Sequence, residues 1–150
     1  MIAVDTNLLV YAHRRESRHH EGARHILRGL AEGREPWAIA WPCLYEFASV
    51  ATNPRIWRQA ASSPDQAWQQ IAAWTGSPSL SLLTETDEFL PVLERFLRRP
   101  RVRGPVVHDA RVAAIYIAHA VEELLTADRD FTLFPELPTR NPLAGLPEAT

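Results

Sequence analysis

The sequence predicts an α/β fold: a three-layer α/β/α sandwich around a central parallel sheet of four to five strands. Short apolar runs of strand length alternate with longer segments of helical periodicity along the whole chain. Strands that alternate with helices form parallel sheets covered on both faces. With 150 residues, 46% of them hydrophobic, the chain has the size and apolar content of one domain, residues 1–150.

The first half of the chain contains clear start and stop signals. Gly33 is suited to ending one helix, and Pro42 is suited to the first turn of the next. Asn53-Pro54 and the Gly76-Ser77-Pro78 sequence mark two further helix ends. The expected strands are 1–4 and 37–40, and the expected helices are 6–15, 19–31, 42–52 and a helix from 62–65 to about 75.

In the second half, Thr84 or Thr86 is expected to cap a helix that includes Phe89 and Leu97, with Pro91 near its first turn. The segment from Asp109 to residue 121 is strongly apolar and is expected to be helical. The remaining expectations are strands at 80–83 and 123–126, a loop at 100–105, a short fifth strand at 137–140 and an irregular tail from 141.

Four carboxylates occur where apolar runs stop. Asp5 and Asp128 follow the first and fourth strands, Asp109 opens a helix, and Glu46 lies one turn into the helix after the second strand. Because ligands bind at the carboxyl ends of parallel strands, all four side chains are expected to face one edge of the sheet. Gathered acids repel each other unless divalent cations compensate them, and such oxygens suit Mg²⁺ or Mn²⁺.

Each acid also has a structural interpretation. Asp5 and Asp109 could be ordinary helix N-caps, Asp128 a turn residue and Glu46 an exposed helix residue. Four separate explanations are then needed at four strand or helix junctions, so the joint pattern favours a functional site.

The four acidic motifs resemble those of the PIN domain, and more closely those of the VapC toxin ribonucleases of bacterial toxin–antitoxin pairs. The resemblance covers nearly the whole chain, and the motifs come in the family's order. They are Val4-Asp5-Thr6-Asn7, Tyr45-Glu46-Phe47, Val107-His108-Asp109-Ala110 and Leu125-Thr126-Ala127-Asp128-Arg129-Asp130-Phe131.

This resemblance implies a Mg²⁺- or Mn²⁺-dependent endoribonuclease that uses the four acids for metal binding and catalysis. Asp5 and Asp109 match the family's best-supported metal ligands, and Thr126 matches a hydroxyl residue that positions water or a ligand. Asp130 could help to bind a second metal or brace its loop. Asn7 could orient Asp5, although a place in the first helical turn is the favoured interpretation.

Basic and aromatic residues supply candidate RNA contacts. Trp57 and Trp68 could stack unpaired bases, although core packing is the commoner role for tryptophan, and the basic residues could simply form a solvated surface. The candidate contacts to the RNA backbone are Arg14, Arg98, Arg99, Arg101, Arg103 and His108.

Partners follow from the resemblance: a cognate VapB-like antitoxin that covers the acidic groove, an RNA substrate such as transfer RNA or ribosomal RNA, and a second copy in a homodimer. The sequence shows no secretory signal and no apolar run of membrane-spanning length, and Cys43 is a lone cysteine. We therefore expect a cytoplasmic protein without membrane contact.

Several other functions are disfavoured. All 16 basic residues are arginine, so phosphatases of the haloacid-dehalogenase type and receiver domains, which need a lysine, do not fit. The glycines form neither a phosphate-binding loop nor a dinucleotide-binding pattern. Two alternatives stay open: another metal-dependent nuclease that prefers DNA, and a PIN-like binding module without activity.

Overall fold

The computed structural model describes residues 1–148 and contains a central sheet of parallel strands. Within this range the sheet has five strands in the order β3-β2-β1-β4-β5. The predicted parallel α/β architecture is confirmed, including the short fifth strand. The strands are β1 (Ile2–Val4), β2 (Trp37–Ala40), β3 (Leu80–Leu83), β4 (Glu123–Leu125) and β5 (Thr139–Arg140).

The strand register explains how distant parts of the chain reach one edge of the sheet. β1 lies in the centre, where Ile2 pairs with Trp37 of β2 and Val4 pairs with Leu125 of β4. β1 and β4 therefore end side by side, and the Asp5 N–H donates to the Leu125 carbonyl at 3.0 Å. The strand order reverses at β1: the chain adds β2 and β3 on one side of it and then crosses over to add β4 and β5 on the other. Such a reversal opens a binding site at the carboxyl ends of the strands.

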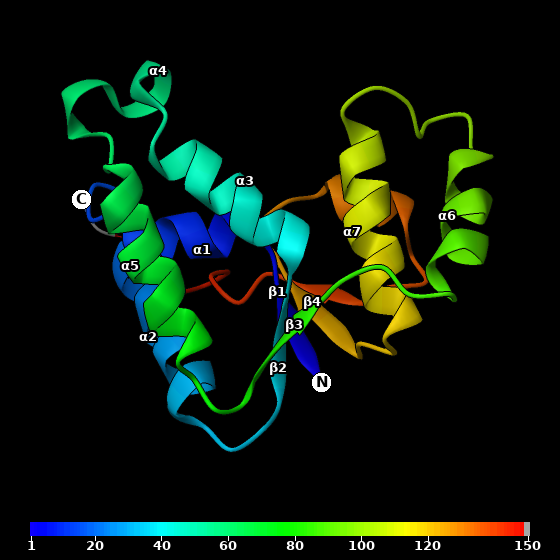
Figure 1. Ribbon diagram of the computed structural model, residues 1–150, viewed down its shortest axis with the longest axis horizontal. Coiled ribbons are helices and arrows are strands. Elements are labelled where there is room, and N and C mark those ends of the chain that lie inside the picture. Colours follow the sequence, from blue (N-terminus) through cyan, green and yellow to red (C-terminus); the bar gives the residue numbers. More distant parts are fainter. Residues whose placement is uncertain (149–150) are drawn as a thin grey trace.

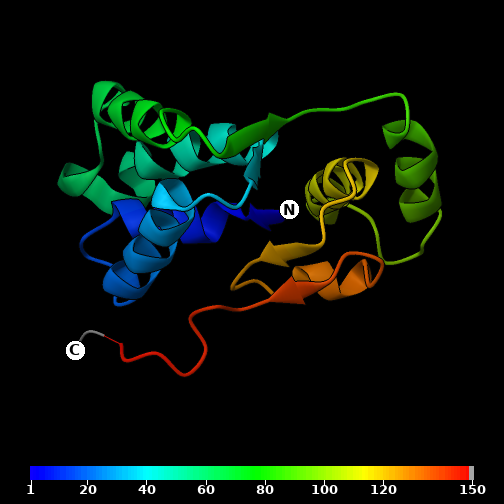
Figure 2. The same ribbon diagram turned by 90° about the horizontal axis from the view of Figure 1, so that it is seen from below.

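Helices cover the sheet in two groups (Figures 1 and 2). α1, α2, α3 and α5 pack together on one side, and α6 packs against α7 on the other. The helices are α1 (Thr6–His13), α2 (His20–Glu32), α3 (Trp41–Ala51), α4 (Pro54–Trp57), α5 (Pro64–Thr75), α6 (Phe89–Leu97) and α7 (Val106–Ala118), with short 3-10 turns η1 (Arg58–Ala60) and η2 (Asp130–Leu133).

Two predicted helix starts are wrong. α6 begins at Phe89 without a side-chain cap, because the Thr84 hydroxyl donates to the Glu85 carboxylate and the Thr86 carbonyl accepts the Phe89 N–H. α7 begins at Val106, directly after Pro105, so Asp109 lies in its first turn instead of capping it. The same helix ends earlier than predicted, because Ala120 takes a positive φ of 56° and the chain reverses there.

The apolar core lies between the sheet and both helical groups. β2 is buried at all four positions, as expected for a strand with both faces covered. Tyr116 of α7 is fully buried in this core, and its hydroxyl group contacts the Val4 carbonyl at the end of β1. Among the described residues, no helix is both long enough and apolar enough to cross a bilayer.

Candidate active site

Asp5 forms the buried floor of the acidic site. It follows β1, caps α1 and is only 6% exposed. Its Oδ1 accepts the Thr6 N–H at 2.8 Å, so the capping role is real. Its Oδ2 accepts the Thr126 hydroxyl at 2.8 Å. Burial, opposed by these hydrogen bonds, raises the pKa of Asp5 to about 6, and Glu46 and Asp128 add to the rise by repulsion.

Thr126 and Asn7 tie the ends of β1 and β4 together. The Thr126 hydroxyl donates to Asp5 and accepts the Asp128 N–H at 3.0 Å. The Asn7 amide donates to Asp5 Oδ2 at 3.3 Å and to Thr126 Oγ1 at 3.2 Å, while its Oδ1 accepts the Ala127 N–H. Asn7 therefore contacts Asp5 from within the first turn of α1, so it can hold the Asp5 carboxylate as well as serve in the helix.

Glu46 reaches this network through a hydroxyl group. The Thr6 Oγ1 donates to Glu46 Oε2 at 3.0 Å, and the Thr6 N–H donates to Asp5. Phe47, the residue after Glu46, is buried, but Glu46 and Tyr45 are exposed. Glu46 is thus the solvent-exposed acid of the site, and Asp5 is the buried one.

Two buried side chains, Tyr116 and Cys43, pack against the segment that carries Asp5. The Tyr116 hydroxyl donates to the Val4 carbonyl at 3.1 Å and accepts the Ala40 N–H at 2.9 Å. It therefore joins the ends of β1 and β2. The thiol of Cys43 lies 3.9 Å from Asp5 Oδ1, and burial raises its pKa to about 12. Cys43 therefore stays a protonated packing residue.

Asp109 faces the other acids from α7. Partial burial raises its pKa to about 7, with further rises from the negative charges of Asp128, Asp5, Asp130 and Glu46, in that order. Asp128 and Asp130 belong to one turn, in which Asp128 Oδ1 accepts the Asp130 N–H at 2.9 Å. Five carboxylates therefore influence one another at the carboxyl edge of the sheet.

The charges of this group fit a cation better than any other ligand. The pKa of Asp109 is raised by burial and by four acids, and no cationic side chain opposes the rise among its main causes. Within residues 1–148, no three acidic, histidine or cysteine side chains stand close enough to hold one ion as they are. A metal held here by Asp5, Asp109, Asp128 and Glu46 would have to draw their side chains together.

Comparison with known proteins gives the family of this fold and site. The PIN domain model matches residues 2–137, which include all five acids. The chain belongs to the PIN domain family. It is 34% identical to the VapC ribonuclease Mb2897 of Mycobacterium bovis over 145 residues, which cover 97% of both chains.

Solved PIN domain structures share the fold at lower sequence identity. The VapC20 toxin of Mycobacterium tuberculosis, described as cleaving the sarcin-ricin loop, has a TM-score of 0.65 and 19% identity, and the match covers 88% of this chain and 93% of that one. VapBC2 of Rickettsia felis, bound to a promoter DNA fragment, also has a TM-score of 0.65 and 19% identity, covering 93% and 98%.

The predicted basic residues of this PIN domain lie in two different environments. Arg101, Arg103 and His108 are exposed on α7 or the loop before it. Arg98 is also exposed and pairs with Glu94 at 2.8 Å. Arg99 is half-buried, and it is engaged because it donates to the Leu133 carbonyl at 2.7 Å and pairs with Glu136. Arg103 is engaged only through its Nε, which donates to the Pro100 carbonyl at 3.0 Å, so Arg101 and Arg103 are the exposed arginines best able to contact a substrate.

Arg14 does not reach the acids. It is only 4% exposed, its guanidinium lies 4.1 Å from the centre of the Trp57 ring, and it donates to the Ser62 hydroxyl at 3.1 Å. The prediction that Arg14 contacts RNA therefore finds no support, since the side chain anchors the segment after α3. Trp57 is engaged too, because its ring N–H donates to the Val50 carbonyl at 2.8 Å.

Sequence reasoning missed Tyr116, and it missed the basic residues of α4 and η1. Tyr116 could not be recognised as a site residue, because residues 112–118 around it are uniformly apolar and nothing there marks a polar contact. Arg55 and Arg58 are exposed. They lie after Glu46 within residues 47–64, a segment that contains no acidic residue. This local excess of positive charge could have been recognised in the sequence. Figure 1 shows α4 and the α6–α7 loop projecting from the same end of the molecule.

The pKa of Asp5 makes stability depend on pH. In the folded protein the Asp5 carboxyl group keeps its proton up to about pH 6, whereas in the unfolded chain an aspartic acid releases it near pH 4. The contribution of Asp5 to the free energy of unfolding therefore falls as pH rises between these values. We expect wild type to lose about 2 kcal/mol relative to Asp5→Asn between about pH 4.5 and 7.5 without metal, measured by urea unfolding.

The variant is needed as the reference because His13 acts in the opposite direction. Burial lowers the pKa of His13, so its contribution to stability grows as pH rises through its titration range. Subtracting the stability of Asp5→Asn from that of wild type at each pH removes the contribution of His13. A difference that stays flat over the whole range would contradict the assignment of a raised pKa to Asp5.

Proposed function

We propose that this PIN domain is a metal-dependent endoribonuclease toxin that hydrolyses RNA phosphodiester bonds. The observation that supports the proposal most is the cluster of Asp5, Glu46, Asp109 and Asp128 at one sheet edge, with raised pKa values for Asp5 and Asp109. The VapC ribonucleases among its relatives give the class of reaction. A complete set of acids argues against a binding module without activity.

A divalent cation, Mg²⁺ or Mn²⁺, is the proposed cofactor. When bound, it makes water nucleophilic near neutral pH and relieves charge on the phosphoryl oxygens. Asp5, Asp109, Asp128 and Glu46 would hold it, and Asp130 is placed to add charge from the same loop. Thr126 and Asn7 both donate to Asp5 Oδ2, and the Thr6 N–H donates to Oδ1, so these hydrogen bonds fix the orientation of the Asp5 carboxylate before a metal binds.

The proposal is tested by incubating purified protein with RNA and with single-stranded DNA of the same sequence, in Mg²⁺, in Mn²⁺ and in chelator. We expect cleavage of RNA only, only with a divalent ion, and not by Asp109→Asn. Cleavage of DNA at a similar rate would favour the alternative of a general nuclease. A protein that cuts neither polymer in any divalent ion would instead be the inactive binding module.

Arg101 and Arg103 are proposed to bind the RNA backbone beside the acids. Phosphate contacts release counterions, so each one contributes to the salt dependence of binding. Arg101→Ala should weaken RNA binding for all sequences alike and reduce the slope of log affinity against log salt by about 0.7. The measurement is fluorescence anisotropy with labelled RNA and the non-cleaving Asp109→Asn protein as background.

Arg34→Ala is the matched control for this measurement. Arg34 is also exposed, but it precedes β2 and lies at the amino edge of the sheet, opposite Asp5. Its substitution removes the same charge from the molecule and should leave the salt slope unchanged. Equal slopes for Arg34→Ala and Arg101→Ala would show that the effect comes from net charge alone.

A VapB-like antitoxin and a homodimer complete the proposal. The Rickettsia felis neighbour is a VapBC complex, which supports a partner of this kind for the present fold. The antitoxin would cover the acidic edge and block RNA. Expression without the partner should arrest growth, and co-expression should restore it. Harmless high expression of active enzyme would argue against the toxin role, and transfer RNA or ribosomal RNA remains the proposed target class.

A further inference from the structure

Two exposed aromatic side chains stand beside the acidic site on α3. Tyr45 is 71% exposed and Trp41 is 39% exposed, although both are large and partly apolar. Their ring centres are 6.3 Å apart with an interplanar angle of 35°, so they form a tilted pair one helical turn apart. The roles expected for the acids and the arginines do not account for the exposure of these two rings.

The aromatic pair is fixed to the acids by the backbone. Trp41 directly follows Ala40, whose N–H is held by the Tyr116 hydroxyl that also donates to the Val4 carbonyl. Tyr45 directly precedes Glu46, whose carboxylate accepts the Thr6 hydroxyl. Both ends of the pair are therefore tied to residues that flank Asp5. Pro42 lies between the two and restricts the backbone at the start of α3.

We propose that Tyr45, supported by Trp41, stacks on an unpaired RNA base next to the phosphodiester bond that is cleaved. Single-stranded RNA is recognised chiefly by stacking of splayed bases on aromatic rings, which need to be exposed and rigid. Tyr45 is exposed and paired with the Trp41 ring, whereas the Trp57 ring is covered by Arg14. This inference rests on the proposed ribonuclease function, and it names the form of RNA that the site accepts: an unpaired nucleotide.

The test couples a change in the protein to a change in the RNA. The probe is the shortest RNA fragment that wild type cleaves, together with versions in which the nucleotide on either side of the cleaved bond is abasic. Rates at limiting substrate are measured for wild type, Tyr45→Ala, Tyr45→Phe and Leu90→Ala. Leu90 is the matched control because it is a large side chain that is 67% exposed, lies on α6 and has no expected contact with RNA.

On intact RNA, Tyr45→Ala should reduce kcat/KM by about 5- to 150-fold, which is the range of one lost stacking contact. Tyr45→Phe keeps the ring and Leu90→Ala leaves the site unchanged, so both should stay within about twofold of wild type. At one of the two positions, the abasic RNA should be cleaved equally by wild type and Tyr45→Ala, because the partner of the ring is missing. This loss of the difference is the distinctive result.

Two results would overturn the inference. In the first, the losses from Tyr45→Ala and from each abasic position multiply, which means that ring and base act independently. In the second, Tyr45→Ala changes the molecular mass in light scattering, which would make the aromatic pair a contact between protein chains. If wild type cleaves no RNA, the proposed function itself fails, and that failure is seen before any variant is compared.

Discussion

Asp5→Asn is expected to lower the rate of RNA cleavage by at least about 100-fold while the protein stays folded. The substitution keeps the shape of the side chain but removes the charge at the floor of the site, where Asp5 is buried against the ends of β1 and β4. An amide cannot supply the anionic oxygen that a hard divalent cation requires. Single-turnover cleavage of RNA at saturating Mg²⁺ measures the effect on the chemical step.

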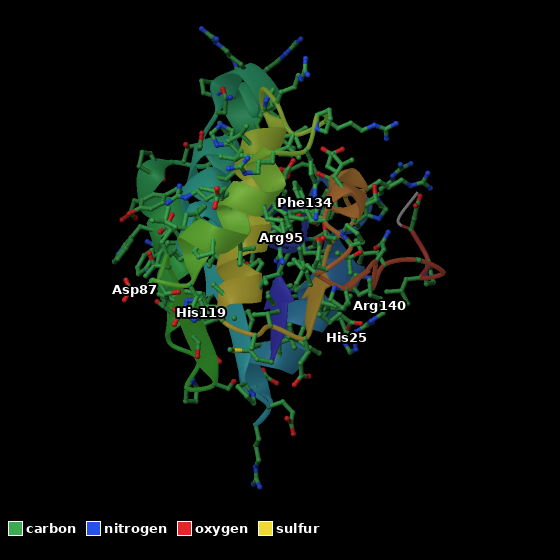
Figure 3. All side chains as sticks on the ribbon, turned by 90° about the vertical axis from the view of Figure 1, so that its right-hand side faces the viewer. His25, Asp87, Arg95, His119, Phe134 and Arg140 are labelled. Atoms are coloured by element: carbon green, nitrogen blue, oxygen red, sulfur yellow. The ribbon has the colours of Figure 1, made fainter. Side chains whose placement is uncertain are left out.

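The fold should tolerate this change. The lost hydrogen-bond acceptor weakens contacts to Thr126 and Asn7, but removal of the charge also ends the repulsion from Glu46 and Asp128. Asp87→Asn is the matched control, because Asp87 is an exposed aspartate at the edge of the molecule (Figure 3). It should keep wild-type activity. An Asp5→Asn protein with more than about a tenth of that activity would remove Asp5 from the catalytic machinery.

The second large effect concerns the metal itself. Addition of Mg²⁺ or Mn²⁺ should stabilise the folded protein, because a cation binds the clustered acids only when the fold gathers them. At a concentration of 100 times Kd, the free energy of unfolding should rise by about 2.7 kcal/mol. Removal of the ion by chelator should abolish cleavage, and its return should restore it. Thermal unfolding at about pH 8, where Asp5 and Asp109 are ionised, provides the measurement.

Asp109→Asn separates specific binding from a general salt effect. This variant should be more stable than wild type without metal, since it lacks one of the repelling charges at the site. It should also gain much less stability from Mg²⁺. Sodium chloride at matched ionic strength should reproduce neither result. Equal stabilisation of wild type and variant by Mg²⁺ would place the ion somewhere other than among these carboxylates.

The sheet could be predicted because its signals are local. The strands at Trp37–Ala40 and Leu80–Leu83 are found with the predicted bounds, since each is a short, largely apolar run between clear breaks. The starts of α6 and α7 were missed because they depend on competing contacts: Thr84 is engaged by Glu85, and Pro105 precedes the true start of α7. Helix ends near proline and threonine cannot be settled by propensity alone.

The candidate site likewise contains residues that could be predicted from local signals and residues whose environments could not. Asp5 and Asp128 could be predicted from their positions after strands, because the carboxyl ends of parallel strands meet at one edge of the sheet. Thr126 was expected only from the resemblance to the PIN domain family. The environments of Arg14, Tyr45 and Tyr116 could not be predicted. Arg14 is buried by a contact with Trp57 far along the chain, and Tyr116 bonds to a backbone carbonyl of β1. Such contacts depend on packing between elements, which a single sequence does not record.

The central claim is that distant acids converge to bind a divalent cation, and titration calorimetry with Mn²⁺ tests it most directly. Wild type at about pH 8 should bind Mn²⁺ saturably, and more weakly at about pH 5.5, where the Asp5 and Asp109 carboxylates hold protons. Asp5→Asn and Asp109→Asn should each lose most of this affinity, while Asp87→Asn should bind as wild type does. Absence of Mn²⁺ binding by wild type, or undiminished binding by both site variants, would contradict the account.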